Sequence, residues 1–234
     1  MDIERDEDIW VFSIGNIVQD IGTVYQIYHC EYKKKSTECV SLDTQILFFL
    51  STIARAFWVN DTYLRKVFIS NIELFCSFII HTYFIVYVIM SRNESTMNQL
   101  LAVKKRFWER WYFLAVITFG LGFFIHPSSY YYYRNYLRDI QMCVSFNIFT
   151  DAASLIPQLP LIYKEGDVGS VSRTYVIFLF IARCIRVVFW LIWEDSGYYI
   201  YLLIADGIYL ACVGVFVLSF CGNVNKMILP IKNQ

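Results

Sequence analysis

The hydrophobic positions of this 234-residue chain are grouped into long blocks that short polar stretches separate. Apolar blocks of about 18–25 residues are long enough to cross a hydrocarbon core about 30 Å thick as α-helices. The pattern predicts seven such spans, at 10–28, 42–59, 67–90, 111–126, 138–161, 174–193 and 197–221. The connections leave no room for a soluble domain, so the predicted fold is an all-α membrane protein with seven transmembrane helices.

Composition agrees with this prediction. Hydrophobic residues make up 57% of the chain and the mean hydropathy is +0.46, whereas soluble domains are about 45–50% apolar. With seven spans, twelve basic residues lie in loops on one side of the membrane and five on the other. The positive-inside rule therefore predicts a lumenal or external N-terminus and a cytosolic C-terminal tail at 222–234.

Two segments of the chain resemble each other. VSLDTQILFFLSTIAR (40–55) and VGSVSRTYVIFLFIAR (168–183) both end in Ile-Ala-Arg, 128 positions apart. The match predicts one membrane domain, 1–234, built from two parallel three-helix repeats at 10–90 and 138–221 that the linker span 111–126 joins. A three-residue match between two apolar helices also arises by chance, and that alternative stays open.

Charged side chains inside the predicted spans are the candidates for function. Arg183, Arg186 and Trp190 lie at i, i+3 and i+7 and so share one helix face. An arginine at mid-bilayer costs about 2.5–3.5 kcal/mol and normally faces a partner or a cavity. The candidate partners are four acids within the spans, Asp20, Glu73, Asp151 and Asp206. Two interpretations remain: arginine forks that hold a ligand carboxylate, or arginines and acids that pair with each other and fix the helices.

Motifs of catalysis, of metal ligation and of phosphate binding do not occur in the sequence. Seven scattered cysteines and three histidines without ligand spacing favour buried core positions over a metal site. The sequence therefore predicts a protein that is not an enzyme and that uses no cofactor, no metal and no nucleic acid. Its predicted surroundings are the lipid bilayer.

The run PQLPLIYKEGDVGSVSRTYVIFLFIAR (157–183) resembles the KDEL receptors, the family of endoplasmic reticulum (ER) lumen protein-retaining receptors. The matching positions are Pro157, Gln158, Leu159, Lys164, Gly166, Asp167, Ser170, Ser172, Tyr175 and Arg183. SLDTQILF, followed by Ile-Ala-Arg at 53–55, is similar to a second stretch of that family. Pro157-Gln158 also resembles the wider PQ-loop group, whose SWEET-type transporters share the three-plus-one-plus-three layout.

The resemblance implies a receptor in the ER and Golgi membranes. Such a receptor binds the C-terminal tetrapeptide of lumenal ER proteins and returns them in vesicles of the coat protein I (COPI) coat, which would contact Lys226 and Lys232 of the tail. Carried over by position, Arg55 and Arg183 would meet the peptide's carboxylates, and Trp190 would face its lysine. Asp151 takes the place of a family glutamate.

The chain also departs from the family pattern. Gln19 or Asp20 stands where the family has a histidine tied to pH sensing, and Arg186 is an additional arginine. We expect Asp151 and Asp20 to act as counter-charges, and peptide binding to strengthen as the pH falls. The alternative functions are a small-solute transporter of the PQ-loop type, for a sugar or an anion, and a scaffold that binds no cargo.

Overall fold

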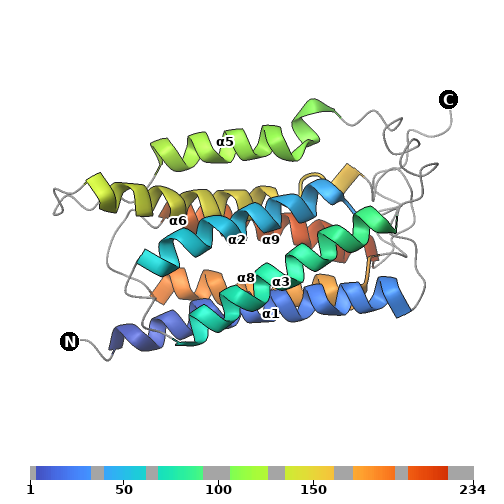
Figure 1. The fold of residues 1–234 in the computed structure, drawn as a ribbon, viewed down its shortest axis with the longest axis horizontal. Coiled ribbons are helices and arrows are strands. Elements are labelled where there is room, and N and C mark those ends of the chain that lie inside the picture. Colours follow the sequence, from blue (N-terminus) through green and yellow to red (C-terminus); the bar gives the residue numbers. More distant parts are fainter. Residues whose placement is uncertain are drawn as a thin grey trace.

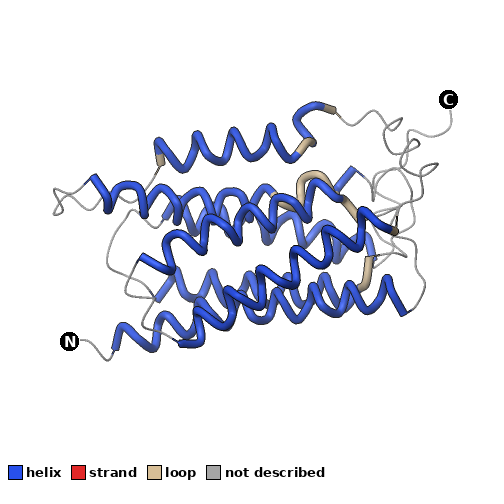
Figure 2. Tube along the Cα trace, viewed as in Figure 1, coloured by secondary structure: helices blue, strands red, loops and turns tan. Residues whose placement is uncertain are grey.

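The computed structural model describes residues 4–32, 40–61, 68–91, 106–125, 135–160, 171–192 and 200–220. In this part of the chain there are seven α-helices, one 3-10 turn and no strand (Figure 2). The elements are α1 (Glu4–Tyr32), α2 (Leu42–Asp61), α3 (Phe68–Met90), η2 (Phe107–Glu109), α5 (Trp111–Phe124), α6 (Asn135–Ala153), α8 (Arg173–Ile192) and α9 (Ile200–Phe220).

One helix lies at each of the seven predicted spans, although the boundaries differ. α1 begins at Glu4, whereas the prediction began at residue 10, because the acidic start of the chain continues the helix outside the apolar block. Three segments are long and apolar enough to cross a membrane: Phe68–Met90, Arg173–Leu191 and Ile200–Leu218. The other four are shorter or carry more polar residues, so the structure identifies a membrane protein without separately establishing each of the seven spans.

Helix α3 has its polar side chains inside and its apolar side chains outside. Ser70, Glu73, Ser77 and His81 are buried. Most of its exposed residues are large and apolar: Phe68, Ile72, Phe75, Phe78, Ile79, Tyr83, Val86, Ile89 and Met90. Polar residues that face the bundle interior and apolar residues that face outward are the arrangement expected of a helix in lipid.

Six helices pack around one another, each against two neighbours, and α5 lies outside them (Figure 1). For description we divide the six into two triples, α1–α3 and the set α6, α8 and α9. In the first triple, α1–α3, helix α3 packs against both α1 and α2. In the second triple, formed by α6, α8 and α9, helix α9 packs against both α6 and α8. The triples meet where α1 packs on α8 and α2 packs on α6, and α5 lies against α6 and the edge of α2.

Small residues bring α1 close to α8. A Cβ added to Gly15 would lie 3.1 Å from Cγ of Arg186, and one added to Gly22 would lie 2.6 Å from Cβ of Phe178. Any side chain at Gly22 would therefore push the two helices apart. This close approach places the neighbouring polar residues of α1 beside the arginines of α8.

A buried polar clamp joins α2 to α6 at the other contact between the triples. Asn147 Nδ2 donates to the backbone oxygen and to Oγ of Ser51, at 2.9 and 2.7 Å. Ser51 Oγ donates back to the Asn147 backbone oxygen at 3.1 Å. These three hydrogen bonds hold α2 against α6 through groups that would otherwise be buried without partners.

Candidate functional site

Arg183 lies at the centre of the second triple and is fully buried. Its Nη1 is 2.5 Å from Asp206 Oδ1 of α9, and its Nη2 is 2.8 Å from Asp151 Oδ2 of α6. Nη2 also donates, over 3.5 Å, to Gln19 of α1. The guanidinium carbon lies 3.7 Å from the ring centroid of Tyr209, so the cation is stacked on an aromatic face as well as paired.

Arg186 and Trp190 extend the same cluster along α8. Arg186 Nη1 forms an ion pair with Asp151 Oδ2, and Nη2 lies 3.2 Å from Asp206 Oδ1. Trp190 Nε1 donates to Asp206 Oδ2 at 2.7 Å. Arg183, Arg186 and Trp190 all contact Asp206, so they occupy one face of α8, as their spacing predicts.

Arg55 holds a second cluster in the first triple. Its Nη2 is 2.7 Å from Glu73 Oε1 and donates to Ser77 Oγ at 2.8 Å. Ser77 Oγ also contacts Glu73 Oε1 at 2.7 Å and Asp20 Oδ2. Arg55, Glu73, Ser77 and Asp20 therefore link α1, α2 and α3 through a single hydroxyl group.

We call these seven charged residues the arginine network: Asp20, Arg55, Glu73, Asp151, Arg183, Arg186 and Asp206. None of their side chains is more than 9% exposed. All six binding residues predicted from the sequence lie in this network or, for Trp190, bond directly to it. The pairing of arginines with acids, one of the two interpretations of the sequence, is present in this conformation.

The arginines nevertheless keep donor capacity. Within the described residues, the Nε atoms of Arg55, Arg183 and Arg186 are buried and have no hydrogen-bond partner. Buried polar groups are normally satisfied, so each such donor calls for an explanation. One of the explanations is that a ligand supplies the missing acceptor.

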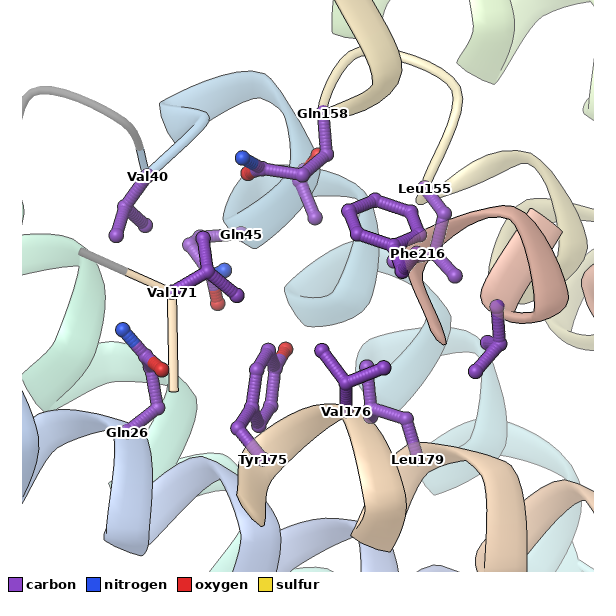
Figure 3. Close-up of a pocket in the computed structure, with 12 residues that line it drawn as sticks. Gln26, Val40, Gln45, Leu155, Gln158, Val171, Tyr175, Val176, Leu179 and Phe216 are labelled. Carbon is purple, nitrogen blue, oxygen red and sulfur yellow. The ribbon is translucent and has the colours of Figure 1, made fainter. Parts of the chain in front are cut away.

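A separate pocket lies at the end of the bundle where α1 ends and α2 begins (Figure 3). It is a small, partly open hollow, and the twelve residues that line it are all neutral. Two glutamines at its edge cap helices of the opposite triple. Gln158 Oε1 accepts from the backbone N–H of Ser41 at 2.7 Å, and Gln26 Oε1 accepts from that of Ser172 at 2.8 Å.

Several predicted positions lie outside the described residues. They are the tail 222–234 with Lys226 and Lys232, and the loop residues Lys164, Gly166, Asp167 and Ser170. Of the matching positions in the PQ-type run, Gln158 caps α2 and Tyr175 lines the same pocket. Gln158 thus has a structural role that the motif alone did not indicate.

The sequence is similar to one family of known proteins. The model of the family described as ER lumen protein retaining receptor matches residues 36–193, which is more than half of the chain. The chain belongs to this family. An ER lumen protein-retaining receptor of Entamoeba histolytica is 24% identical over 184 residues, which cover 77% of this chain and 78% of the relative.

Vertebrate relatives give the same result. ER lumen protein-retaining receptor 3 of Xenopus tropicalis is 26% identical over 187 residues, covering 79% of this chain and 78% of the relative. Receptor 2 of Rattus norvegicus is 23% identical over 184 residues, with 79% of each chain covered. The resemblance read from the sequence is thus confirmed: the protein is a membrane receptor of a family concerned with retention in the ER lumen, not of a family of enzymes.

The matched segment includes only part of the arginine network of this receptor. Arg55, Glu73, Asp151 and both arginines of α8 fall within residues 36–193, whereas Asp20 and Asp206 lie outside this segment. Sequence reasoning had not singled out Ser77 or Gln26. One further similarity in the sequence lies in α1 and α6, where NIVQD (16–20) recurs as NIFTD (147–151), 131 positions apart.

Proposed function

We propose that this receptor binds the C-terminal tetrapeptide of lumenal ER proteins, with a sequence similar to Lys-Asp-Glu-Leu, for retrieval from the Golgi. The observation that carries the proposal is the set of three buried guanidinium groups, each with an Nε–H that has no hydrogen-bond partner among the residues the structure describes. A tetrapeptide of this kind carries carboxylates, and arginine binds carboxylates through two parallel N–H donors. The peptide's carboxylates would take the free donors and displace the receptor's own acids in part.

Trp190 supplies a surface for the peptide's lysine in this proposal. Its indole N–H is held by Asp206, which fixes the ring, and the ring packs edge-on against Phe189 with centroids 4.9 Å apart. An ammonium group over an indole face gains about 0.5–2 kcal/mol, depending on exposure. A fixed ring is suited to this contact because it loses no rotational freedom on binding.

We propose an orientation with the N-terminus in the lumen and the C-terminal tail in the cytosol, in the membranes of the ER and the Golgi. Support comes from the twelve-to-five distribution of basic residues. The pocket near Gln158 then lies at the cytosolic end, and the tail with Lys226 and Lys232 is available to the COPI coat. Labelling of a cysteine introduced at Ser36 checks the orientation, because lumenal access to it would contradict the proposal.

We further propose that the two triples are parallel repeats. The order of packing supports this, since the third helix lies between the first two in each triple. The glutamine caps support it as well, because each glutamine binds the residue just before the second helix of the opposite triple. A register of 131 positions aligns Asn16 with Asn147, Asp20 with Asp151, Ser41 with Ser172 and Arg55 with Arg186.

This register differs from the one that Ile-Ala-Arg suggests. A shift of 128 positions equates Arg55 with Arg183, whereas the caps at Ser41 and Ser172 equate Arg55 with Arg186. The difference is three residues, close to one helical turn, so both arginines of α8 remain on the inner face. In the 131 register, Thr52 occupies the position of Arg183.

The caps give a test of the repeat. Replacing Gln26 or Gln158 with alanine leaves a buried backbone N–H without an acceptor, which costs about 1–3 kcal/mol. We expect both variants to lower the thermal stability of the purified receptor by similar amounts. Gln45→Ala is the control, since Gln45 lines the same pocket and caps no helix. A loss confined to Gln158→Ala would contradict the equivalence of the two caps.

Peptide binding is tested by replacing one arginine together with the acid that pairs with it. The double variant Arg55→Gln with Glu73→Gln removes one cation and one acid together, so the net charge of the cluster is unchanged and the fold should persist while one arginine is lost. We expect binding of a peptide ending in Lys-Asp-Glu-Leu to weaken by about 2 kcal/mol or more, roughly 30-fold in Kd. Isothermal titration calorimetry with the purified receptor measures this Kd.

Glu73→Gln alone is the matched control, because it keeps the Arg55 cation and releases it from its acid. We expect this variant to bind at least as tightly as the parent. A peptide with an amidated C-terminus should bind weakly to every form. If the parent binds no member of a panel of C-terminal tetrapeptides, the proposal fails and the solute transporter or the scaffold takes its place.

A further inference from the structure

The charges of the two triples do not balance in the same way. The second triple contains Arg183 and Arg186 with Asp151 and Asp206, which is two cations for two acids. The first triple contains Arg55 with Glu73 and Asp20, which is one cation for two acids. The surplus carboxyl group of the arginine network therefore lies in the first triple.

The hydrogen bonds of Ser77 show how the surplus carboxyl group is accommodated. Its Oγ has three polar neighbours: Arg55 Nη2 at 2.8 Å, Glu73 Oε1 at 2.7 Å and Asp20 Oδ2. A serine hydroxyl carries one hydrogen and two lone pairs. Arg55 donates to one lone pair, and the hydroxyl hydrogen serves only one carboxylate. The third contact is satisfied when the other carboxyl group donates a hydrogen of its own.

The surroundings indicate which carboxyl group this is. Glu73 Oε1 already faces the Arg55 cation at 2.7 Å, which favours its ionised form. Within the described part of the chain, Asp20 has no hydrogen bond to an arginine; its Oδ2 contacts Ser77 and its Oδ1 lies 3.7 Å from His81 Nε2. Asp151, which aligns with Asp20, instead forms ion pairs with both arginines of α8.

A second observation concerns His81, whose ring lies beside this cluster. The side chain is 2% exposed, its ring is stacked on Phe48, and its Nδ1 has no hydrogen-bond partner within the described residues. Its Nε2 faces Asp20 beyond hydrogen-bond distance. A neutral ring and a neutral acid can lie together in this way, whereas an ionised Asp20 would leave a buried charge without a close cation.

We infer that Asp20, Ser77 and Glu73 form a proton-binding site, and that Asp20 carries the proton on Oδ2. Asp20 then donates to Ser77 Oγ, Ser77 donates to Glu73 Oε1, and Glu73 pairs with Arg55. The arginine network becomes electrically neutral. The charged and titratable groups around Asp20 are Glu73 and His81 of α3, Arg55 of α2, and Asp151 of α6, which itself pairs with Arg183 and Arg186 of α8.

Infrared spectroscopy of the purified receptor tests the site without any cargo peptide. At neutral pH surface carboxyl groups are ionised, so a buried protonated carboxyl group gives a separate C=O stretching band. We expect the parent and His81→Gln to show this band and Asp20→Asn to lose it. Absence of the band in the parent, its persistence in Asp20→Asn, or its loss in His81→Gln would overturn the assignment.

Thermal stability gives the second measurement. Asparagine has the shape of protonated aspartate and its Nδ2 can donate to Ser77, so Asp20→Asn should melt close to the parent. The parent binds one proton more when folded, so its melting temperature should fall as the pH rises, and that of Asp20→Asn should not. An Asp20→Asn variant that does not fold would show that Asp20 is ionised and would also overturn the inference.

Discussion

Replacing Arg183 with alanine is expected to destabilise the receptor by about 3–5 kcal/mol, the range for breaking a buried ion pair by removing one partner. Arg183 forms ion pairs with acids on two other helices, Asp151 of α6 and Asp206 of α9. Without it, Arg186 is the one cation left for two buried carboxylates of the second triple. Thermal unfolding in detergent measures the effect, together with the yield of folded protein.

Two variants separate this effect from a general loss of positive charge. Arg173→Ala removes the exposed arginine at the start of the same helix and should change the free energy of unfolding by no more than about 0.5 kcal/mol. Arg183→Met combined with Asp206→Asn removes a cation and an acid together, and should recover much of the stability. An Arg183→Ala variant that melts with the parent would mean that the observed pairs contribute no net stability.

This prediction changes how arginine substitutions in the receptor are interpreted. From the sequence alone, loss of peptide binding in Arg183→Ala would be attributed to a missing contact with the ligand. Because Arg183 also joins three helices of the second triple, the same variant disturbs the fold. Arg55 is the better probe of binding, since its ion pair with Glu73 can be removed as a unit.

Much of this site could be predicted from the sequence. The spacing of Arg183, Arg186 and Trp190 placed them on one face, and the cost of an unpaired charge in lipid required acids nearby. The sequence could not assign partners to the arginines. Which acid meets which arginine depends on the angle and depth at which helices cross, and those follow from contacts such as Gly15 against Arg186.

The repeated Asn-Ile-x-x-Asp is present in the sequence, but a match of three residues does not show what its aspartates contact. Its two aspartates have different partners. Asp151 pairs with arginines, whereas Asp20 meets Ser77, a residue with no distinguishing pattern around it. A serine at i+4 from Glu73 on an apolar helix is common, so its importance appears only when α1 is placed against α3.

The last expected result concerns pH. With Asp20 ionised the arginine network carries one negative charge more than positive charges, and with Asp20 protonated it is neutral. An anionic peptide binds better to the neutral form, and by linkage the peptide in turn favours the bound proton. We therefore expect the affinity for a peptide ending in Lys-Asp-Glu-Leu to rise as the pH falls, by at most about tenfold per pH unit for one linked proton.

Asp20→Asn provides the matched comparison, because it fixes the network in its neutral form. This variant should bind the peptide at neutral pH as tightly as the parent binds it at mildly acidic pH, and its affinity should not change between the two. His81→Gln should retain the parent's pH dependence.

If the parent's affinity is the same at both pH values while the infrared band of Asp20 is present, the proton stabilises the fold and does not control cargo binding. If the dependence disappears in His81→Gln and persists in Asp20→Asn, the histidine of α3 is the group that links protons to binding, since it is the titratable side chain that faces Asp20 across the α1–α3 contact.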